Sequence, residues 1–390
     1  MKFQKIAFLL GSAFPTPKAY GITTRETINV LIKDSFNVRV FCYKSYYSDP
    51  DFDSILPLIA YYKLGYISKY LRKIALAGVS KFNSVLFRLV SILVLFNNIS
   101  QLKHFNPEVI WTREPLYAFI CLIRMKNIKV ILEVHEISNF LSFRILNKFL
   151  DHILFCPINE PNLKFLQKNF FEDFNFEISP MGINANSVAS RDEVKNFVKR
   201  VKNLQLNSMK IAYVGKLRPT TYSKGIEDLI LLAKLLQDNK SYMEVNLIGA
   251  MKGDDKFIRQ LTTTHSIDKN YLKIHEHVPH SIAVALLKRF DVLVLPSYAD
   301  SSYIGMPLKL LEYLASGRIV IFGKSQLYKD MIPDNIKIFS YSPNDVNDLY
   351  ESILDALNYE QLENLIISGI EFAETLTWEN RTRKIISRAH

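Results

Sequence analysis

The stretch DVLVLPSYADSSYIGMPLKLLEYLASGRIVIFGKS, residues 291–325, places a helical pattern between two apolar runs of strand length. The runs are VLVLP (292–296) and IVIF (319–322), and the helical pattern ends at Gly317. Short apolar runs separated by a helix are typical of parallel strands that are buried on both faces. Pro307 suits the first turn of that helix, because this position needs no backbone N–H. The stretch therefore predicts a strand–helix–strand unit of an α/β sheet.

The same alternation extends along most of the chain. The other strand candidates are residues 6–10, 38–43, 109–112, 129–135, 153–158, 210–214, 244–249 and 271–278. The length of 390 residues exceeds one ordinary domain and suits two. We expect two doubly wound, Rossmann-like α/β domains that face each other across a cleft. Ligands in such sheets bind outside the carboxyl ends of the strands.

A polar segment without a strand pattern separates the two halves. We predict a first domain at residues 1–184, a linker at 185–207 and a second domain at 208–372. Residues 373–390 are predicted to form a helix that packs back on the body, with Trp378 as its anchor.

Cysteine usage argues for a reducing compartment. The three cysteines are odd in number and form no CxxC pair, which excludes a zinc ribbon. We expect Cys42, Cys121 and Cys156 to be plain core residues.

The positive charge is concentrated in the first half, where residues 1–190 hold 22 Lys and Arg against 14 Asp and Glu. Residues 54–107 contain no acidic side chain, but they carry seven Lys and Arg among aromatic and aliphatic residues. Such a surface attracts anionic lipid headgroups or phosphate-bearing substrates. A solvated basic face on a buried helix would explain the same pattern.

No stretch of the sequence is predicted to span a membrane. The most apolar run, residues 84–96, is interrupted by Arg88 and is shorter than the roughly 20 residues that a span needs. The first 14 residues imitate a short signal peptide, but we interpret them as the first core strand. The expected location is the cytoplasm, with peripheral binding at the inner face of the membrane.

A candidate phosphate site follows the first strand of the second half, in YVGKLRPTTYSKGIEDLI (213–230). The loop after Gly215 supplies Lys216, Arg218 and Lys224 just before a predicted helix. Cations beside free helix amides can bind a diphosphate. A polar strand–helix loop with lysines placed by chance is the alternative.

The helix after Pro307 carries Lys309 and Glu312 on one face. The carboxylate can accept hydrogen bonds from both hydroxyl groups of a ribose, and free amides before the helix can hold a phosphate. A surface ion pair between Lys309 and Glu312 is the alternative.

Together these segments resemble the nucleotide-sugar half of the retaining glycosyltransferases of family 4, which have the GT-B fold. The matching segments are 215–217, 224–225, 291–297 and 312–317. In the first half, weaker matches to the family's glycine-rich loop and interior strands are Gly21, WTREPLYAF (111–119), EVHE (133–136) and SPMGIN (179–184).

The resemblance implies roles for individual residues. Lys216 and Lys224 would hold the donor diphosphate, and Glu312 would bind the ribose. The implied caps of the distal phosphate are backbone amides around Pro307, Leu308 and Lys309. Gly21 would let the first-domain loop approach the phosphates closely.

The sequence departs from the family pattern at two places. Ile304 stands eight residues before Glu312, where the family has a glutamate, although Asp300 could take its place. Many relatives have a histidine at the position of Arg113. The catalytic or sugar-contacting role would then fall to Arg113, Glu114 or His135.

Metal binding has little support in the sequence. Asp51 and Asp53 spell the DxD signature of another glycosyltransferase fold, but they lie in a polar turn. Alternation along a strand already explains the spacing of His275 and His277, and His280 follows the strand. We expect no metal ligand and no cofactor.

The function that follows is transfer of a sugar, with retention and without metal, from a UDP- or GDP-linked donor to a glycan or lipid-linked acceptor. This chemistry would serve the assembly of bacterial-type surface polysaccharide or glycolipid. The alternatives are a nucleotide-sugar-binding subunit with reduced activity, supported by Ile304, and a sugar-nucleotide epimerase of related fold. We expect no nucleic-acid partner.

Overall fold

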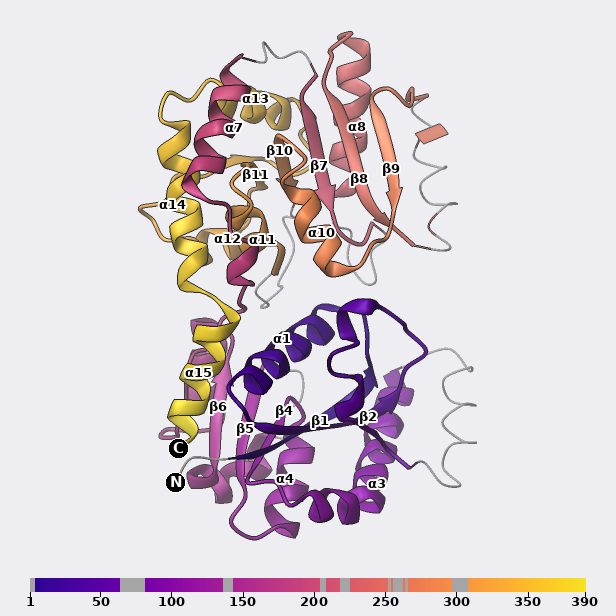
Figure 1. Cartoon of the computed structure of the whole chain (residues 1–390), viewed down its shortest axis with the longest axis vertical. Helices are drawn as coiled ribbons and strands as arrows, with labels where there is room; N and C mark the ends of the chain where they lie inside the picture. The colour runs from indigo at the N-terminus through magenta and orange to yellow at the C-terminus, as the bar shows by residue number, and fades with distance from the viewer. Residues whose placement is uncertain are drawn as a thin grey trace. The chain divides into compact units, whose positions relative to one another are not determined.

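The chain folds into two α/β units in a computed structural model (Figure 1). The structure describes residues 4–63, 81–135, 143–203, 208–217, 225–251, 254, 262–263, 266–296 and 308–390. The first unit contains Met1–Met181 and Trp378–His390, and the second contains Gly182–Thr377. The last helix therefore belongs to the unit that the chain left almost 200 residues earlier.

The first unit holds a six-stranded sheet in the order β3-β2-β1-β4-β5-β6, in which every pair of neighbours is parallel. Its strands are β1 (Lys5–Phe14), β2 (Asn37–Lys44), β3 (Ile59–Tyr61), β4 (Val109–Thr112), β5 (Lys129–Val134) and β6 (Ile153–Pro157). Its α-helices are α1 (Ala19–Lys33), α3 (Lys81–Phe105), α4 (Pro115–Arg124), α6 (Glu160–Asn169) and α15 (Trp378–Ala389). Short 3-10 turns are η1 (Pro50–Phe52), η2 (Leu56–Leu58) and η3 (Ile145–His152).

Both faces of the first sheet are buried. Along β1, Ile6 and Phe8 join one apolar cluster, and Ala7 and Leu9 between them join another. Successive side chains of a strand point to opposite faces, so the two clusters lie on opposite sides of the sheet. α1 and α15 contribute to the first cluster, and α4 contributes to the second.

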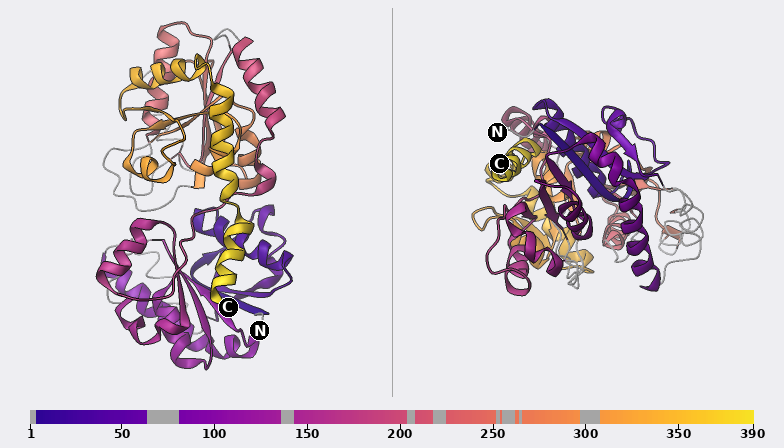
Figure 2. Two further views of the ribbon diagram at one scale, coloured as in Figure 1. Left: turned by 90° about the vertical axis from the view of Figure 1, so that its left-hand side faces the viewer. Right: turned by 90° about the horizontal axis from the view of Figure 1, so that it is seen from below.

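The second unit repeats the same topology with the order β12-β11-β10-β7-β8-β9. Its strands are β7 (Lys210–Val214), β8 (Glu244–Ala250), β9 (Leu272–Glu276), β10 (Val292–Leu295), β11 (Ile319–Gly323) and β12 (Phe339–Tyr341). Its helices are η4 (Ala185–Ser187), α7 (Arg191–Asn203), α8 (Ile226–Asp238), α10 (His280–Leu287), α11 (Leu308–Ala315), α12 (Gln326–Met331), α13 (Val346–Leu357) and α14 (Leu362–Thr375). Helices lie on both sides of the sheet (Figure 2).

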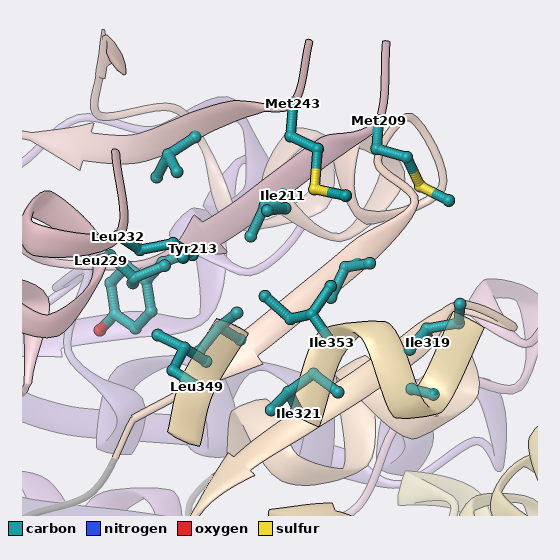
Figure 3. Packing of buried hydrophobic residues seen from close by; sticks show 14 of the residues in the cluster. Met209, Ile211, Tyr213, Leu229, Leu232, Met243, Ile319, Ile321, Leu349 and Ile353 are labelled. Carbon is teal, nitrogen blue, oxygen red and sulfur yellow. The ribbon is translucent and has the colours of Figure 1, made fainter. Parts of the chain in front are cut away.

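The core of the second unit forms where helices cover the parallel strands. Ile211 and Ile321 of the sheet pack with Leu229 of α8 and with Leu349 and Ile353 of α13 (Figure 3). The segment predicted as a linker contains α7, whose apolar face joins this same cluster.

All ten strand candidates are present, and the expectation of two doubly wound, Rossmann-like domains is confirmed. In each sheet the strand order reverses between the first and fourth strands, which are β1 and β4 in one unit and β7 and β10 in the other. Ligands in such sheets bind outside the carboxyl ends of the strands at this reversal. None of the helices in the described part is both long and apolar enough to cross a membrane.

Candidate functional site

At the reversal point of the second sheet, two glycines make room for a lysine. A Cβ atom on Gly215, directly after β7, would lie 2.1 Å from Cε and 2.5 Å from Nζ of Lys309. A Cβ atom on Gly249 of β8 would lie 2.2 Å from the carbonyl oxygen of Gly215. Both glycines also have positive φ angles, of 155° and 124°, which side chains rarely adopt. The glycines therefore allow close approach of the two strand ends and of the Lys309 ammonium group.

A hydrogen bond joins α11 to the same end of β7. The backbone N–H of Val214 donates to the hydroxyl oxygen of Tyr313 at 2.8 Å, and that hydroxyl lies 3.3 Å from the Val214 carbonyl. Lys309, one turn earlier, holds its Nζ atom 5.8 Å from the centre of the Tyr213 ring. Lys309 makes no ion pair with any residue in the described ranges. Its charge is thus available to an anion at the end of β7, which Lys216 follows directly in the chain.

Glu312 is hydrogen-bonded to a histidine. Its Oε1 atom is 2.5 Å from Nε2 of His280, the first residue of α10. Both side chains are largely buried, with 11% of Glu312 and 20% of His280 exposed. This contact replaces the surface ion pair between Lys309 and Glu312 that the sequence also allowed. A carboxylate held at this edge is suited to accept hydrogen bonds from sugar hydroxyl groups.

The first domain contains a buried charge network around Glu133 of β5, which is 3% exposed. Its Oε1 atom accepts hydrogen bonds from Trp111 Nε1 at 3.1 Å and from Arg381 Nη2 at 2.7 Å. Its Oε2 atom lies 2.8 Å from Arg113 Nε and 3.0 Å from His135 Nε2. Although burial opposes ionisation, Arg381 and Arg113 hold the pKa of Glu133 well below its ordinary value. The carboxylate is therefore ionised and has two partners on each oxygen.

The network determines the proton positions on His135. Burial and the charge of Arg113 lower the pKa of His135 to about 4, against the opposing effect of Glu133. The ring is thus neutral near pH 7. Because an ionised carboxylate can only accept, the shared hydrogen bond requires the proton on Nε2. Nδ1 is then a hydrogen-bond acceptor at the carboxyl end of β5.

The neighbouring residues at the end of β4 are also fixed. Glu114 precedes α4, and its backbone N–H donates to the Thr112 hydroxyl at 3.1 Å. Gly11 of β1 lies under its side chain, since a Cβ atom there would be 2.7 Å from Glu114 Oε1. The reversal point of the first sheet thus carries Arg113, Glu114 and, one strand away, His135.

One known protein family matches most of the second unit. Residues 194–371 match the family described as Glycosyl transferases group 1. These residues are a group 1 glycosyltransferase domain. Gly215, Gly249, Lys309 and Glu312 all lie inside it.

The whole chain is similar in fold to several solved structures. Sucrose-phosphate synthase from Thermosynechococcus elongatus is 16% identical with a TM-score of 0.69, and 98% of this chain and 97% of that chain are covered. A glycosyltransferase from Rickettsia africae is 14% identical with a TM-score of 0.69, covering 100% and 98%. HepE from Anabaena, in complex with UDP and glucose, is 14% identical with a TM-score of 0.65, covering 98% of each chain. These likenesses show the GT-B fold. No curated protein sequence matches the chain significantly.

Several predicted site residues can now be placed in the group 1 domain. Leu308 is the first residue of α11 and is 8% exposed, and Lys309 and Glu312 follow on the same helix. Lys216 lies in the loop after β7, where its carbonyl oxygen is 3.4 Å from the Tyr213 hydroxyl. The sequence features outside the described residues are Arg218, Lys224, Asp300, Ile304 and Pro307.

The residues of the first domain that the sequence singles out lie in different structural environments. Gly21 lies in the first turn of α1, where a Cβ atom would be 2.3 Å from the Thr16 carbonyl oxygen, so packing already requires a glycine there. Asp51 of the DxD sequence forms an ion pair with the buried Arg25 at 3.0 Å. The cysteines Cys42, Cys121 and Cys156 are buried, as expected of core residues.

Three residues of these sites were missed by sequence reasoning. Glu133 could have been found, because it stands two residues before His135 and therefore shares its strand face. His280 was noted only as part of a histidine cluster, and His275 of that cluster instead lies 3.1 Å from the amide oxygen of Asn246. Arg381 gave no signal, because its partner lies 248 residues away in the chain.

Proposed function

We propose that the chain is a retaining glycosyltransferase of family 4 that uses a nucleoside diphosphate sugar as donor. The observation that carries this proposal is the group of Gly215, Gly249, Lys309 and Glu312 at the reversal point of the group 1 domain. This group combines an ammonium charge for a phosphate with a carboxylate for a sugar hydroxyl. HepE, a neighbour in fold, was solved with UDP and glucose, which supports a nucleotide-sugar donor here.

The proposed mechanism relies on electrostatic stabilisation of the leaving group. The diphosphate gains negative charge as the glycosidic bond to it breaks, and Lys309 and Lys216 would stabilise that charge. Lys224 would add a third cation. Because the lysines take the place of a divalent ion, the transfer is proposed to need no metal. The assay of sugar transfer that tests the proposal is accordingly run in excess EDTA.

In the first domain, His135 is proposed to contact the sugar, with Arg113 and Glu114 beside it at the acceptor side. A neutral ring with Nδ1 free of a proton can accept a hydrogen bond from a hydroxyl group. Gly21 and the amides around Pro307 and Leu308 are proposed to approach the phosphates. The acceptor is proposed to be a glycan or a lipid-linked sugar in surface polysaccharide or glycolipid assembly.

The test begins with a thermal-shift screen of UDP, GDP and ADP and of their sugar conjugates. A nucleotide that raises the melting temperature is then used as its labelled sugar conjugate, and hydrolysis and transfer to acceptors are measured. Binding with product formation supports an enzyme. Binding without any turnover would favour a nucleotide-sugar-binding subunit, and lack of binding would refute the donor assignment.

Removing either lysine charge should weaken nucleotide binding. We expect Lys216→Met and Lys309→Met each to weaken the binding free energy of the selected nucleoside diphosphate by about 1.5–3 kcal/mol, because each loses a charge-assisted hydrogen bond. Methionine keeps most of the side-chain length beside Gly215. Isothermal titration calorimetry measures the effect, and Lys234→Met on α8, where Lys234 pairs with Asp238, is the matched control. Unchanged affinity in both folded variants would contradict the phosphate assignment.

We also propose that residues 54–107 bind an anionic membrane surface from the cytoplasmic side. Within the described part, Leu56, Tyr61 and Leu93 are exposed by 44%, 39% and 54%. Lys69, Arg72 and Lys73 lie outside the described residues.

Each cation near an anionic surface adds about 1 kcal/mol of binding. We expect the protein to sediment with anionic liposomes, to be released by high salt and to ignore neutral liposomes. Replacement of Lys69, Arg72 and Lys73 by glutamate should weaken sedimentation with anionic liposomes but leave nucleotide affinity unchanged. Equal binding to both kinds of liposome would leave residues 54–107 as an ordinary basic face.

A further inference from the structure

The last helix inserts one arginine into the first domain. α15 begins at the buried Trp378, and Arg381 on its first turn is 6% exposed. Arg381 donates from Nη2 to Glu133 and lies 3.4 Å from the Ser179 carbonyl oxygen through Nε. Other cations of α15, namely Arg383, Lys384 and Arg388, are more than half exposed and pair at the surface.

Arg381 and His135 bind opposite oxygens of one carboxylate. Arg381 and Trp111 hold Oε1 of Glu133, and this leaves Oε2 directed at Arg113 and at Nε2 of His135. Rotation of the carboxylate away from His135 would break both hydrogen bonds on Oε1 inside the core, where unmet polar groups are costly. Arg381 therefore fixes the plane of the carboxylate that orients the histidine ring.

The charges of the network also favour a neutral ring. Two guanidinium groups face one carboxylate, so the network is already cationic before His135 gains a proton. A second positive charge in a buried site is unfavourable. The charged groups that act on the ring are Arg113 directly after β4, Glu133 of β5 and Arg381 of α15. α6 contributes the neutral Asn162, which donates to the His135 carbonyl oxygen at 3.3 Å.

We propose that Arg381 is a positioning residue for His135. It holds Glu133 so that His135 stays neutral, with its proton on Nε2 and its Nδ1 atom available to accept a hydrogen bond from a hydroxyl group of the sugar substrate. The role toward the sugar rests on the proposed function, whereas the state of the ring does not. The last helix thus sets the protonation of a residue at the carboxyl end of β5. The lowered pKa of His135, to which burial, Arg113 and Arg381 all contribute, is consistent with this role.

The experiment is a pH titration of the histidine side chains by two-dimensional ¹⁵N NMR, with the His135 signals assigned from a His135→Asn variant. In the wild-type protein we expect His135 to stay neutral from pH 8 to 5 and to carry its proton on Nε2. In Arg381→Gln, one neighbouring positive charge is lost, so we expect the pKa of His135 to rise. Arg381→Lys keeps the charge and should restore the wild-type titration.

The control is Arg383→Gln, which removes an exposed arginine of the same helix that pairs with Asp34. This variant should titrate as the wild type does. An unchanged His135 titration in folded Arg381→Gln would overturn the proposal. If Arg381→Gln does not fold, the wild-type spectrum still decides, because a proton on Nδ1 or titration near pH 6.5 would overturn it.

The NMR readout is independent of the donor site. Nucleoside diphosphate affinity should be equal in the wild type and in Arg381→Gln, because Arg381 and the group 1 domain site lie in different units. Absence of nucleotide binding in the wild type would refute the proposed function and leave the His135 result standing. A merely structural role for Arg381 would change stability without changing the tautomer or pKa of His135.

Discussion

Replacement of Glu133 by glutamine is expected to lower the free energy of unfolding of the first domain by about 3–5 kcal/mol. Glutamine keeps the shape of the side chain but leaves Arg113 and Arg381 without a counter-charge. The side chain of Arg381 is 3% exposed, so water cannot replace the lost carboxylate. Urea unfolding, followed by tryptophan fluorescence, measures the loss, because Trp111 and Trp378 both lie in this domain.

The matched control is Glu177→Gln, which makes the same chemical change opposite the same helix. Glu177 pairs with Lys384 and Arg388 of α15, but these two side chains are 66% and 57% exposed. Glu177 is itself only 11% exposed, but water can solvate both of its cationic partners once the negative charge is lost, so the control should lose less stability than Glu133→Gln. Similar losses in the two variants would mean that the Glu133 network is no more important than an ion pair with exposed cations.

The second large effect is expected at the proposed donor site, where Glu312→Gln should weaken nucleoside diphosphate binding by about 2–3 kcal/mol. The neutral amide accepts hydrogen bonds from the ribose hydroxyl groups less strongly than the carboxylate does. The measurement is calorimetry with the nucleotide selected in the thermal-shift screen and with its 2′,3′-dideoxy counterpart. The difference between wild type and variant should be large for the first ligand and small for the second.

Glu351→Gln on the exposed side of α13 is the control for Glu312, because it removes a glutamate charge from the same domain. Its affinity and melting temperature should match those of the wild type. A Glu312→Gln protein with normal affinity but a much lower melting temperature would show that Glu312 serves to hold His280 and not a ligand.

The strand pattern predicted most of the fold because parallel strands buried on both faces leave long apolar runs. The strands that escaped prediction, β3 and β12, have three residues each and lie at sheet edges. Runs this short show no period, and an edge strand is buried less completely than a central one. Their pairing is decided by the neighbouring strands β2 and β11.

The surroundings of the proposed donor site were easier to predict than the Glu133 network. Gly215 and Glu312 lie within sequence segments that resemble the family, and Lys309 precedes Glu312 by three residues on the same helix, so their neighbourhood follows from local order along the chain. The Glu133 network depends instead on register, which sets Arg113, directly after β4, beside Glu133 of β5, and on a helix from the far end of the sequence. Local patterns contain no information on which distant side chain will neutralise a buried charge.

Because the first domain is built from two separate segments of the chain, its folding cannot be completed in the order of synthesis. A ribosome releases residues 1–181 well before residues 378–390, so Glu133 leaves the exit tunnel long before its partner Arg381 is synthesised. Until then the nascent first domain lacks one wall of its core, formed by Ile385 and Ile386 of α15. The second domain can collapse during this interval as an uninterrupted segment, residues 182–377. Completion of the histidine site must therefore wait for the synthesis of α15, and a chain terminated before Arg381 would not complete it.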